Sequence, residues 1–241
     1  MRYVGSKNRL AKRIRDVVTE LRGDRDVYWE PFCGGLNSFA AIAPGFRKAY
    51  ASDTHPDLIM MWQALRDGWT PPDVITEREY ADLKDAEPSA LRGLAGFGGS
   101  FGGKWFGGYA RGGHNASGSP RNHQGESARA ALSRMSSLEG TDVIFRCASF
   151  ESGRASADHV VYCDPPYASS LGYRGTDDFD HQAFWEWCRV QAKSGALVLV
   201  SEYTAPDDME CVAEFDHRMS VALTDDRKMT TERLFRVGSG S

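Results

Sequence analysis

Hydrophobic and polar residues alternate along the chain with two different periods. Short apolar runs rich in β-branched or aromatic residues, ending in polar or glycine-containing segments, are typical of buried strands. The predicted strands begin at Tyr28 and then cover residues 48–53, 142–149, 159–163, 196–200, 214–223 and 231–237. Helical patterns cover residues 55–69, 77–84, 127–137 and 180–195. Strands that alternate with helices in this way predict an α/β fold.

The middle of the chain has a different composition. Pro71-Pro72 interrupts the pattern, and residues 93–125 are rich in glycine. Aromatic residues punctuate this stretch at Phe97, Phe101, Trp105, Phe106 and Tyr109. A flexible linker would explain the glycines but not the regularly placed aromatic residues. We therefore predict a catalytic domain made of residues 1–54 and 140–241, with an inserted region at residues 55–139.

Composition narrows the class of protein. The chain has 241 residues, of which 41% are hydrophobic, and this is enough to bury one core with a modest insertion. We expect no membrane-spanning segment and no signal peptide, and therefore a cytoplasmic protein. The five cysteines lack zinc-like spacing, so no metal site is expected. No obligatory protein partner is evident.

The distribution of charge matters more than its sum. A net charge of −4 argues mildly against nucleic acid as a ligand. Basic residues nevertheless cluster near the start and recur through the central segment: Arg2, Lys7, Arg9, Lys12, Arg13 and Arg15, then Arg92, Lys104, Arg111, Arg121, Arg129 and Arg134. Such a stripe is either a solvated face or a contact surface for phosphates.

The segment Asp164-Pro165-Pro166-Tyr167 directly follows the apolar run at residues 159–163. Ligands of open α/β sheets bind at the carboxyl ends of the strands. A nucleobase amino group is a poor nucleophile because its lone pair is delocalised, and Asp164 and the Pro165 carbonyl offer two acceptors for its N–H bonds. Two prolines hold that carbonyl rigidly, and Tyr167 can stack on the base, a contact worth about 1–3 kcal/mol. A simple turn is the alternative interpretation.

A glycine turn follows the first predicted strand. Glu30-Pro31-Phe32-Cys33-Gly34-Gly35 leaves the strand, and Asn37 or Ser38 is placed to cap the next helix. A turn of this kind lets a nucleotide-like cofactor approach the backbone closely. About twenty residues further on, the next strand ends in Asp53, which is the spacing expected of a carboxylate that binds ribose hydroxyls.

Three separated motifs together resemble the Dam-like DNA adenine-N6 methyltransferases. They are Tyr3-Val4-Gly5-Ser6-Lys7, the glycine turn at residues 30–35, and Asp164-Pro165-Pro166-Tyr167. The cofactor half precedes the catalytic half, with a target-recognition insertion between them, and the resemblance covers nearly the whole chain. It implies a Rossmann-like methyltransferase sheet with an antiparallel edge hairpin. Two positions depart from the family pattern, because Ser6 and Leu36 each stand where a glycine is usual.

The resemblance also implies S-adenosylmethionine as the cofactor. Lys7 would contact its methionine carboxylate, Asp53 its ribose, and Phe150 would flank its adenine. A solvated lysine and a core aromatic residue are the alternatives for Lys7 and Phe150. The residues expected at the cofactor are Tyr3, Gly5, Lys7, Glu30, Phe32, Gly34, Asp53 and Phe150.

The segment from Phe101 to Arg111 resembles the loop that family members use near the flipped base and the target duplex. Glycines allow close backbone approach, and aromatic residues stack on or wedge into a disturbed base step. A purely structural hairpin is the alternative. The residues expected to contact DNA are Arg9, Lys104, Trp105, Tyr109, Arg111 and Arg174.

These inferences predict a site-specific enzyme that methylates N6 of an adenine flipped out of double-stranded DNA, either stand-alone or within a restriction-modification system. Asp164, Pro165, Pro166 and Tyr167 would form its catalytic loop. Cytosine-N4 methylation is the closest alternative, although that enzyme type more often has serine in place of Asp164. A catalytically silent DNA-binding protein of the same fold is the alternative from another class.

Overall fold

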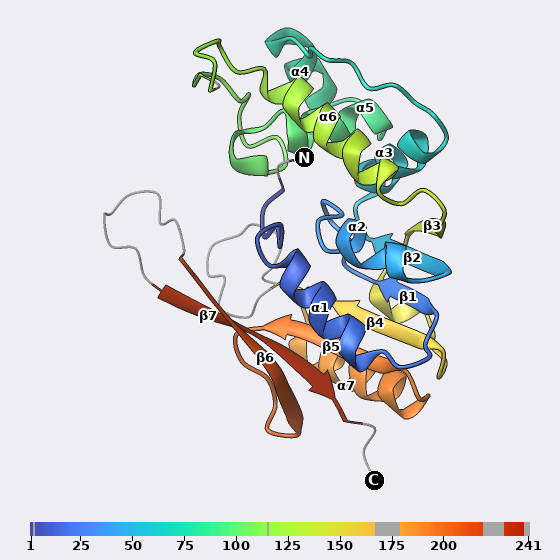
Figure 1. Ribbon diagram of the computed structural model, residues 1–241. Coiled ribbons are helices and arrows are strands. Elements are labelled where there is room, and N and C mark those ends of the chain that lie inside the picture. Colours follow the sequence, from blue (N-terminus) through green and yellow to red (C-terminus); the bar gives the residue numbers. More distant parts are fainter. Residues whose placement is uncertain (2, 115, 167–178, 219–228, 239–241) are drawn as a thin grey trace.

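The computed structural model describes residues 1, 3–114, 116–166, 179–218 and 229–238. Within these residues, seven strands form one sheet in the order β3-β2-β1-β4-β5-β7-β6 (Figure 1). The strands are β1 Val27–Glu30, β2 Lys48–Asp53, β3 Asp142–Cys147, β4 His159–Cys163, β5 Leu197–Glu202, β6 Met209–Arg218 and β7 Met229–Val237. Strands β1 to β5 pair in parallel. These parallel strands confirm the Rossmann-like α/β fold. Strand β7 is antiparallel to both β5 and β6, which confirms the edge hairpin.

The central strands are buried on both faces of the sheet, and successive side chains of a strand enter different cores because they point to opposite faces. Tyr28 belongs to a core with α1 Ala11–Leu21 and α2 Phe39–Ile42, whereas Trp29 belongs to a second core with α7 His181–Lys193. Parallel strands covered on both faces are expected to read as continuous apolar runs. The run at 159–163 has this character.

The remaining helical elements follow β2 or connect strands. They are η1 Ala43–Gly45, α3 Pro56–Arg66, α4 Glu77–Lys84, α5 Ala90–Gly93, η2 Leu94–Gly98, η3 Phe101–Gly103, α6 His123–Ser136 and η4 Phe150–Ser152. Figure 1 shows α4, α5 and α6 gathered beyond one end of the sheet. No helix in the described part of the chain is long and apolar enough to cross a membrane.

Several element boundaries differ from the sequence prediction, and three of them have a visible cause. Helix α6 begins at His123 rather than Ser127, because the Asn122 side chain caps it by accepting a hydrogen bond from the Gly125 amide at 2.9 Å. Strand β5 extends to Glu202, where it still pairs with β7. Strand β6 begins at Met209 rather than 214, because its whole length pairs with β7. A local cap decides the start of α6, whereas pairing with a distant strand decides the ends of β5 and β6.

Helix α3 connects the inserted region to the sheet. The Trp62 indole donates to the Gly34 carbonyl at 3.1 Å, and the Gln63 amide donates to the Phe145 carbonyl at 3.1 Å. Helix α3 therefore supports the glycine turn that follows β1, although it was predicted to belong to the inserted region. The division at residues 54/55 and 139/140 stays a proposal.

Candidate functional site

The strand order reverses between β1 and β4, since β2 and β3 continue from β1 while β5 continues from β4. Open α/β sheets bind ligands outside the carboxyl ends of the strands at such a reversal. Strand β1 ends at Glu30, immediately before residues 31–36, here called the glycine loop. Strand β4 ends at Cys163, immediately before Asp164. The predicted cofactor motif and the predicted catalytic motif therefore meet at this edge.

Lys7 lies against Asp164. Its ammonium donates to Asp164 Oδ1 at 2.7 Å and lies 3.6 Å from Glu232 Oε1 on β7. The exposed fractions of these side chains are 5% for Lys7, 17% for Asp164 and 4% for Glu232. Burial by itself lowers the pKa of Lys7, but the two carboxylates more than offset this and raise it. Lys7 is therefore a buried, charged group at the catalytic candidate rather than a solvated lysine.

Tyr3 covers the glycine loop. A Cβ atom built on Gly34 would lie 2.7 Å from Tyr3 Cε1, and one built on Gly35 would lie 2.8 Å from Tyr3 Cβ. Gly34 also has a φ of +43°, which favours glycine. The pKa of Tyr3 is raised by burial and then by the Asp53, Cys33 and Asp164 charges. Tyr3 thus packs on the glycine loop, and the charges of the predicted ribose carboxylate and the predicted catalytic carboxylate both act on it.

Asp53 is attached to the glycine loop through its side chain. Asp53 Oδ2 accepts a hydrogen bond from the Gly34 amide at 3.0 Å, and Oδ1 accepts one from the His55 amide at 2.9 Å. Burial raises its pKa, although these backbone amides act in the opposite direction. A carboxylate has about four acceptor positions, so two amide bonds leave capacity for ribose hydroxyls. The residues around Asp53 fit the sugar of a nucleoside cofactor.

Glu30 lies inside the protein beneath the loop. Its carboxyl accepts hydrogen bonds from the Tyr28 hydroxyl at 2.8 Å and the Ser38 hydroxyl at 2.6 Å. Burial raises the pKa of Glu30 to about 8, although these hydroxyls favour the charged form. Ser38 stands at the position before α2, but its hydroxyl binds Glu30 instead of capping the helix. The expected capping role of Ser38 is therefore wrong, and Asn37 does not take it over, since Asn37 accepts from Arg134.

Leu36 occupies the position where the family usually has glycine. Its φ is +54°, in the left-handed region, and its side chain is completely buried in the core. The backbone here has the conformation that glycine would adopt, while the leucine side chain packs beneath it. The departure from the family motif therefore preserves the path of the loop.

Phe32 and Phe150 come together at the sheet edge. Their ring centroids are 5.6 Å apart, and each lies 5.7 Å from the ring of Phe184 on α7. Phe150 also contacts Trp187, at 5.3 Å between centroids. Both rings are part of an aromatic cluster, as the core interpretation of Phe150 expects. Contact of either ring with the cofactor stays a prediction.

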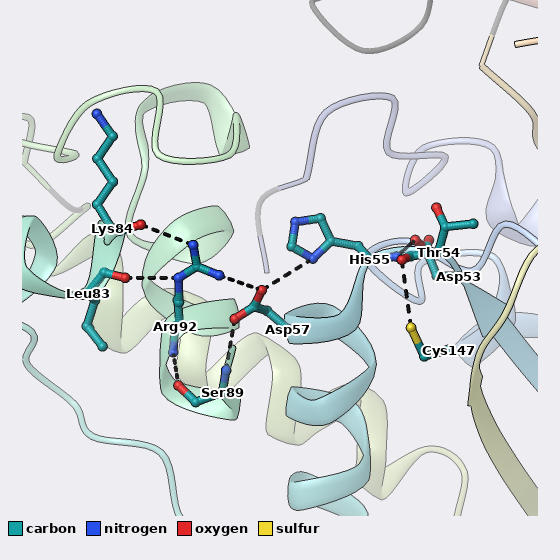
Figure 2. Close-up of polar contacts among 9 residues, drawn as sticks. All are labelled: Asp53, Thr54, His55, Asp57, Leu83, Lys84, Ser89, Arg92 and Cys147. Carbon is teal, nitrogen blue, oxygen red and sulfur yellow. Dashed lines mark hydrogen bonds and ion pairs between the residues drawn. The ribbon is translucent and has the colours of Figure 1, made fainter. Parts of the chain in front are cut away.

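A polar cluster joins the site to the inserted region (Figure 2). Asp57, in the first turn of α3, is buried and pairs with Arg92 Nη1 on α5 at 2.9 Å. Its other oxygen accepts from the Ser89 amide at 2.9 Å, and Arg92 also donates to the carbonyls of Leu83 and Lys84. Asp57 and Arg92 thus attach α4 and α5 to the first turn of α3.

Contacts between aromatic rings also connect the glycine loop to the inserted region. The His55 ring lies 4.2 Å from Trp105 and 4.9 Å from Phe97, and Phe97 lies 5.0 Å from Tyr3, measured between ring centroids. Burial lowers the pKa of His55. These contacts run without a break from the glycine loop to the centre of the inserted region, and the sequence offered no signal for them.

Trp105 and Tyr109 are packed side chains. A Cβ atom built on Gly96 would lie 2.2 Å from the Trp105 ring, and Arg92 stacks on the same ring at 5.1 Å. The Tyr109 hydroxyl donates to the Ile75 carbonyl at 2.7 Å. The role of both aromatic residues in DNA contact stays a prediction, and their present contacts are structural.

The other residues expected to contact DNA differ in their exposure and in their ion pairs. Arg9 and Lys104 are exposed, and Arg111 is exposed but pairs with Glu77. Phe101, at the start of the same glycine-rich segment, is 71% exposed. Tyr167 and Arg174 lie outside the described residues.

In a comparison with known families, residues 3–90 match the D12 class N6 adenine-specific DNA methyltransferases. The resemblance to Dam-like enzymes is thereby confirmed over this segment, which contains the opening motif, the glycine loop and Asp53. The match supports a methyltransferase and identifies S-adenosylmethionine as its cofactor.

No curated protein matches the chain. The chain is similar to several solved structures at low identity. One, described as an RNA methyltransferase from Pyrococcus horikoshii, has a TM-score of 0.44 and 8% identity, with 94% of this chain and 81% of that chain covered. The precorrin 8w decarboxylase of Methanobacterium thermoautotrophicum has a TM-score of 0.42 and 12% identity, with coverages of 94% and 89%. An rRNA methylase from Streptococcus thermophilus has a TM-score of 0.39 and 10% identity, with coverages of 92% and 94%.

Proposed function

We propose that the protein is a site-specific DNA methyltransferase that modifies N6 of an adenine flipped out of double-stranded DNA. The observation that carries this proposal is the position of Asp164. It follows β4 at the reversal of strand order, and it is paired at 2.7 Å with Lys7 of the opening motif. The match of residues 3–90 to an adenine-specific family supports the same conclusion.

The catalytic loop would hold the amino group of the base. Asp164 accepts one N–H and the Pro165 carbonyl accepts the other, which favours a pyramidal nitrogen with an available lone pair. Pro165 is buried, and Pro166 confines it to an extended conformation, so the Pro165 carbonyl is fixed in direction. Holding the nitrogen in one orientation reduces the entropic part of the barrier. Tyr167 would stack on the flipped base.

The cofactor would lie along the glycine loop. S-adenosylmethionine, when bound there, supplies the electrophilic methyl group. Asp53 would accept from the ribose hydroxyls, and Gly34 lets the cofactor approach the backbone. An ammonium has three N–H donors, so Lys7 can bind the methionine carboxylate while it donates to Asp164. The remaining predicted contacts are Tyr3, Gly5, Glu30, Phe32 and Phe150.

The inserted region would face the duplex. Lys104, Arg111 and Arg9 supply cations for phosphates. Phe101 is an exposed ring on a loop that is fixed at both ends: its amide donates to the Gly108 carbonyl at 2.8 Å, and Ser100 pairs with Tyr109. A fixed, exposed aromatic residue suits stacking on a disturbed base step. An enzyme of this kind would act in the cytoplasm, alone or beside a restriction nuclease.

The experiment is transfer of labelled methyl groups from S-adenosylmethionine to unmethylated genomic DNA, with modified bases mapped by single-molecule sequencing. N6-methyladenine at a defined motif would support the proposal. N4-methylcytosine would replace adenine with cytosine as the target, and calorimetric cofactor binding without transfer would favour an RNA substrate or a silent DNA-binding protein. Absence of both binding and transfer would contradict the methyltransferase assignment.

Substitution of the catalytic carboxylate tests the site itself. Asp164→Ala removes one of the two acceptors for the amino group, so methyl transfer should fall at least a hundredfold, within the usual range for a positioned catalytic group of about 10²–10⁴. Cofactor binding, measured by calorimetry, should change little. The exposed Asp16→Ala is the matched control and should leave both unchanged. Loss of cofactor binding together with transfer would instead assign Asp164 a structural role.

A further inference from the structure

A second carboxylate, that of Glu232, lies near Lys7 on the edge hairpin formed by β6 and β7. Glu232 belongs to β7, where its register partner on β6 is Phe215. Leu234, two residues further along the same strand and so on the same face, is completely buried in the core that also contains α1. An apolar residue is therefore the expected occupant of position 232, yet the chain has a carboxylate there with 3% of its surface exposed.

Burial of a carboxylate costs free energy unless a cation or hydrogen bonds compensate it. The cation at this position is Lys7, whose ammonium is 3.6 Å from Glu232 and 2.7 Å from Asp164. If Lys7 served only to neutralise Asp164, one carboxylate would suffice. Two carboxylates, those of Asp164 and Glu232, therefore lie within 4 Å of the Lys7 ammonium.

The carboxylates of Asp164 and Glu232 attract the Lys7 ammonium from different strands of the sheet. Asp164 lies beyond the end of β4, and Glu232 lies on β7, with β5 between these strands in the sheet. The ammonium donates to Asp164 Oδ1 at 2.7 Å and is also attracted by Glu232 at 3.6 Å, so Glu232 acts on the position of Lys7 while Lys7 is bonded to Asp164. A carboxylate has about four acceptor positions, so Asp164 keeps capacity to accept a hydrogen bond from a substrate amino group.

We propose that Glu232 is a positioning residue for methyl transfer, which holds Lys7 so that Lys7 orients Asp164 without neutralising it. This inference rests on the function proposed above and deepens it, because it explains why a catalytic acceptor can be paired with a buried cation. Glu232 contacts neither base nor cofactor in this role, and acts through Lys7.

The central test is Glu232→Gln, which keeps the shape of the side chain and removes its charge. Lys7 would then lose the attraction of Glu232, and kcat for methylation of DNA should fall about 10- to 100-fold, the range seen when partners that orient metal-binding side chains are removed. KM for the cofactor and the calorimetric affinity for S-adenosylhomocysteine should change less than threefold. Glu214→Gln is the control: Glu214 is an exposed carboxylate on the same hairpin, paired with Arg233, and should leave kcat unchanged.

Glu232→Asp separates charge from packing. It restores the negative charge but shortens the side chain and leaves a gap in the core. If charge matters, kcat should decrease in the order wild type, Glu232→Asp, Glu232→Gln. If Glu232 only fills space, the isosteric Glu232→Gln should be more active than Glu232→Asp, and this order would overturn the proposal.

A double-mutant cycle with Lys7→Met tests whether Glu232 acts through Lys7. Glu232→Gln should change kcat less than twofold when Lys7 is already absent, and its full effect in that background would contradict the proposal. An unchanged kcat in Glu232→Gln alone would overturn the positioning role while leaving the proposed function intact. Failure of the wild-type protein to methylate DNA in the same assay would instead reject the proposed function, and the positioning role with it.

Discussion

At the scale of single residues, Leu36 shows how a departure from a motif is accommodated. The usual glycine at this place has no side chain, so a φ of +54° costs it nothing. Leucine in the left-handed region pays about 1–2 kcal/mol in steric energy. Its complete burial contributes more than that, since burying a leucine stabilises by about 1.5–3 kcal/mol. The position therefore combines a strained backbone with a favourable side chain.

This balance predicts an unusual order of stability among variants of Leu36. Leu36→Ala should lower the free energy of unfolding by about 2–5 kcal/mol through the lost packing. Leu36→Gly should be at least as stable as Leu36→Ala, because glycine relieves the strain. At Leu65, a buried helical position, glycine should be less stable than alanine. Urea unfolding measures all four variants, and a less stable Leu36→Gly would contradict the account.

At the scale of elements, a buried ion pair attaches α5 to the first turn of α3. Asp57 on α3 and Arg92 on α5 are both largely shielded from water, with exposed fractions of 1% and 17%. A buried pair contributes little compared with an apolar pair of the same shape, but removal of one partner leaves an uncompensated charge. Helix α5 itself is only one turn long, so its position depends on such contacts.

Asp57→Ala is therefore expected to be strongly destabilising, by about 3–5 kcal/mol in the free energy of unfolding. The double variant with Arg92→Met should recover part of this loss, since the stranded charge disappears. Asp67→Ala removes the exposed partner of Arg66 and should cost less than about 0.5 kcal/mol. Chemical unfolding of the wild type, of Asp57→Ala, of Arg92→Met, of the double variant and of Asp67→Ala gives the comparison. Additive effects of the two single substitutions would show that the pair is not coupled.

At the scale of the whole molecule, buried acids make stability depend on pH. Glu30 has an ordinary pKa of 4.5 and a raised pKa of about 8 in the folded protein. Between these values the folded state holds a proton that the unfolded state has lost. Unfolding then releases a proton, so stability falls as pH rises from about 4.5 to about 8. The raised pKa of Asp53 acts in the same direction.

Glu30→Gln imitates the protonated acid at every pH. The slope of unfolding free energy against pH, measured by urea titration between pH 5 and pH 8, should become less negative than in the wild type. Part of the slope should remain because Asp53 is still present. Glu20→Gln, at an exposed position on α1, should leave the slope unchanged. An unchanged slope in Glu30→Gln would contradict the assignment of this pH dependence to Glu30.

The sequence by itself determined the sheet and the place of the site. Strands read as apolar runs because both faces are buried, and a parallel α/β sheet brings the carboxyl ends of β1, β2 and β4 to one edge. The motifs after those strands, at residues 31–36, Asp53 and Asp164, were therefore predictable as neighbours. The likeness of the opening motif to a known family placed Tyr3 and Lys7 at the same edge.

Only the tertiary structure decided which side chains those residues contact. Glu232 faces Lys7 because β7 inserts between β5 and β6, and a pairing between strands distant in the chain leaves no local pattern. Trp105 looked available for DNA because its glycine-rich surroundings suggested an open loop, but Gly96 lets the indole pack closely inside the inserted region. Local periodicity determines which residues are buried, whereas their partners depend on long-range packing that the sequence pattern does not encode.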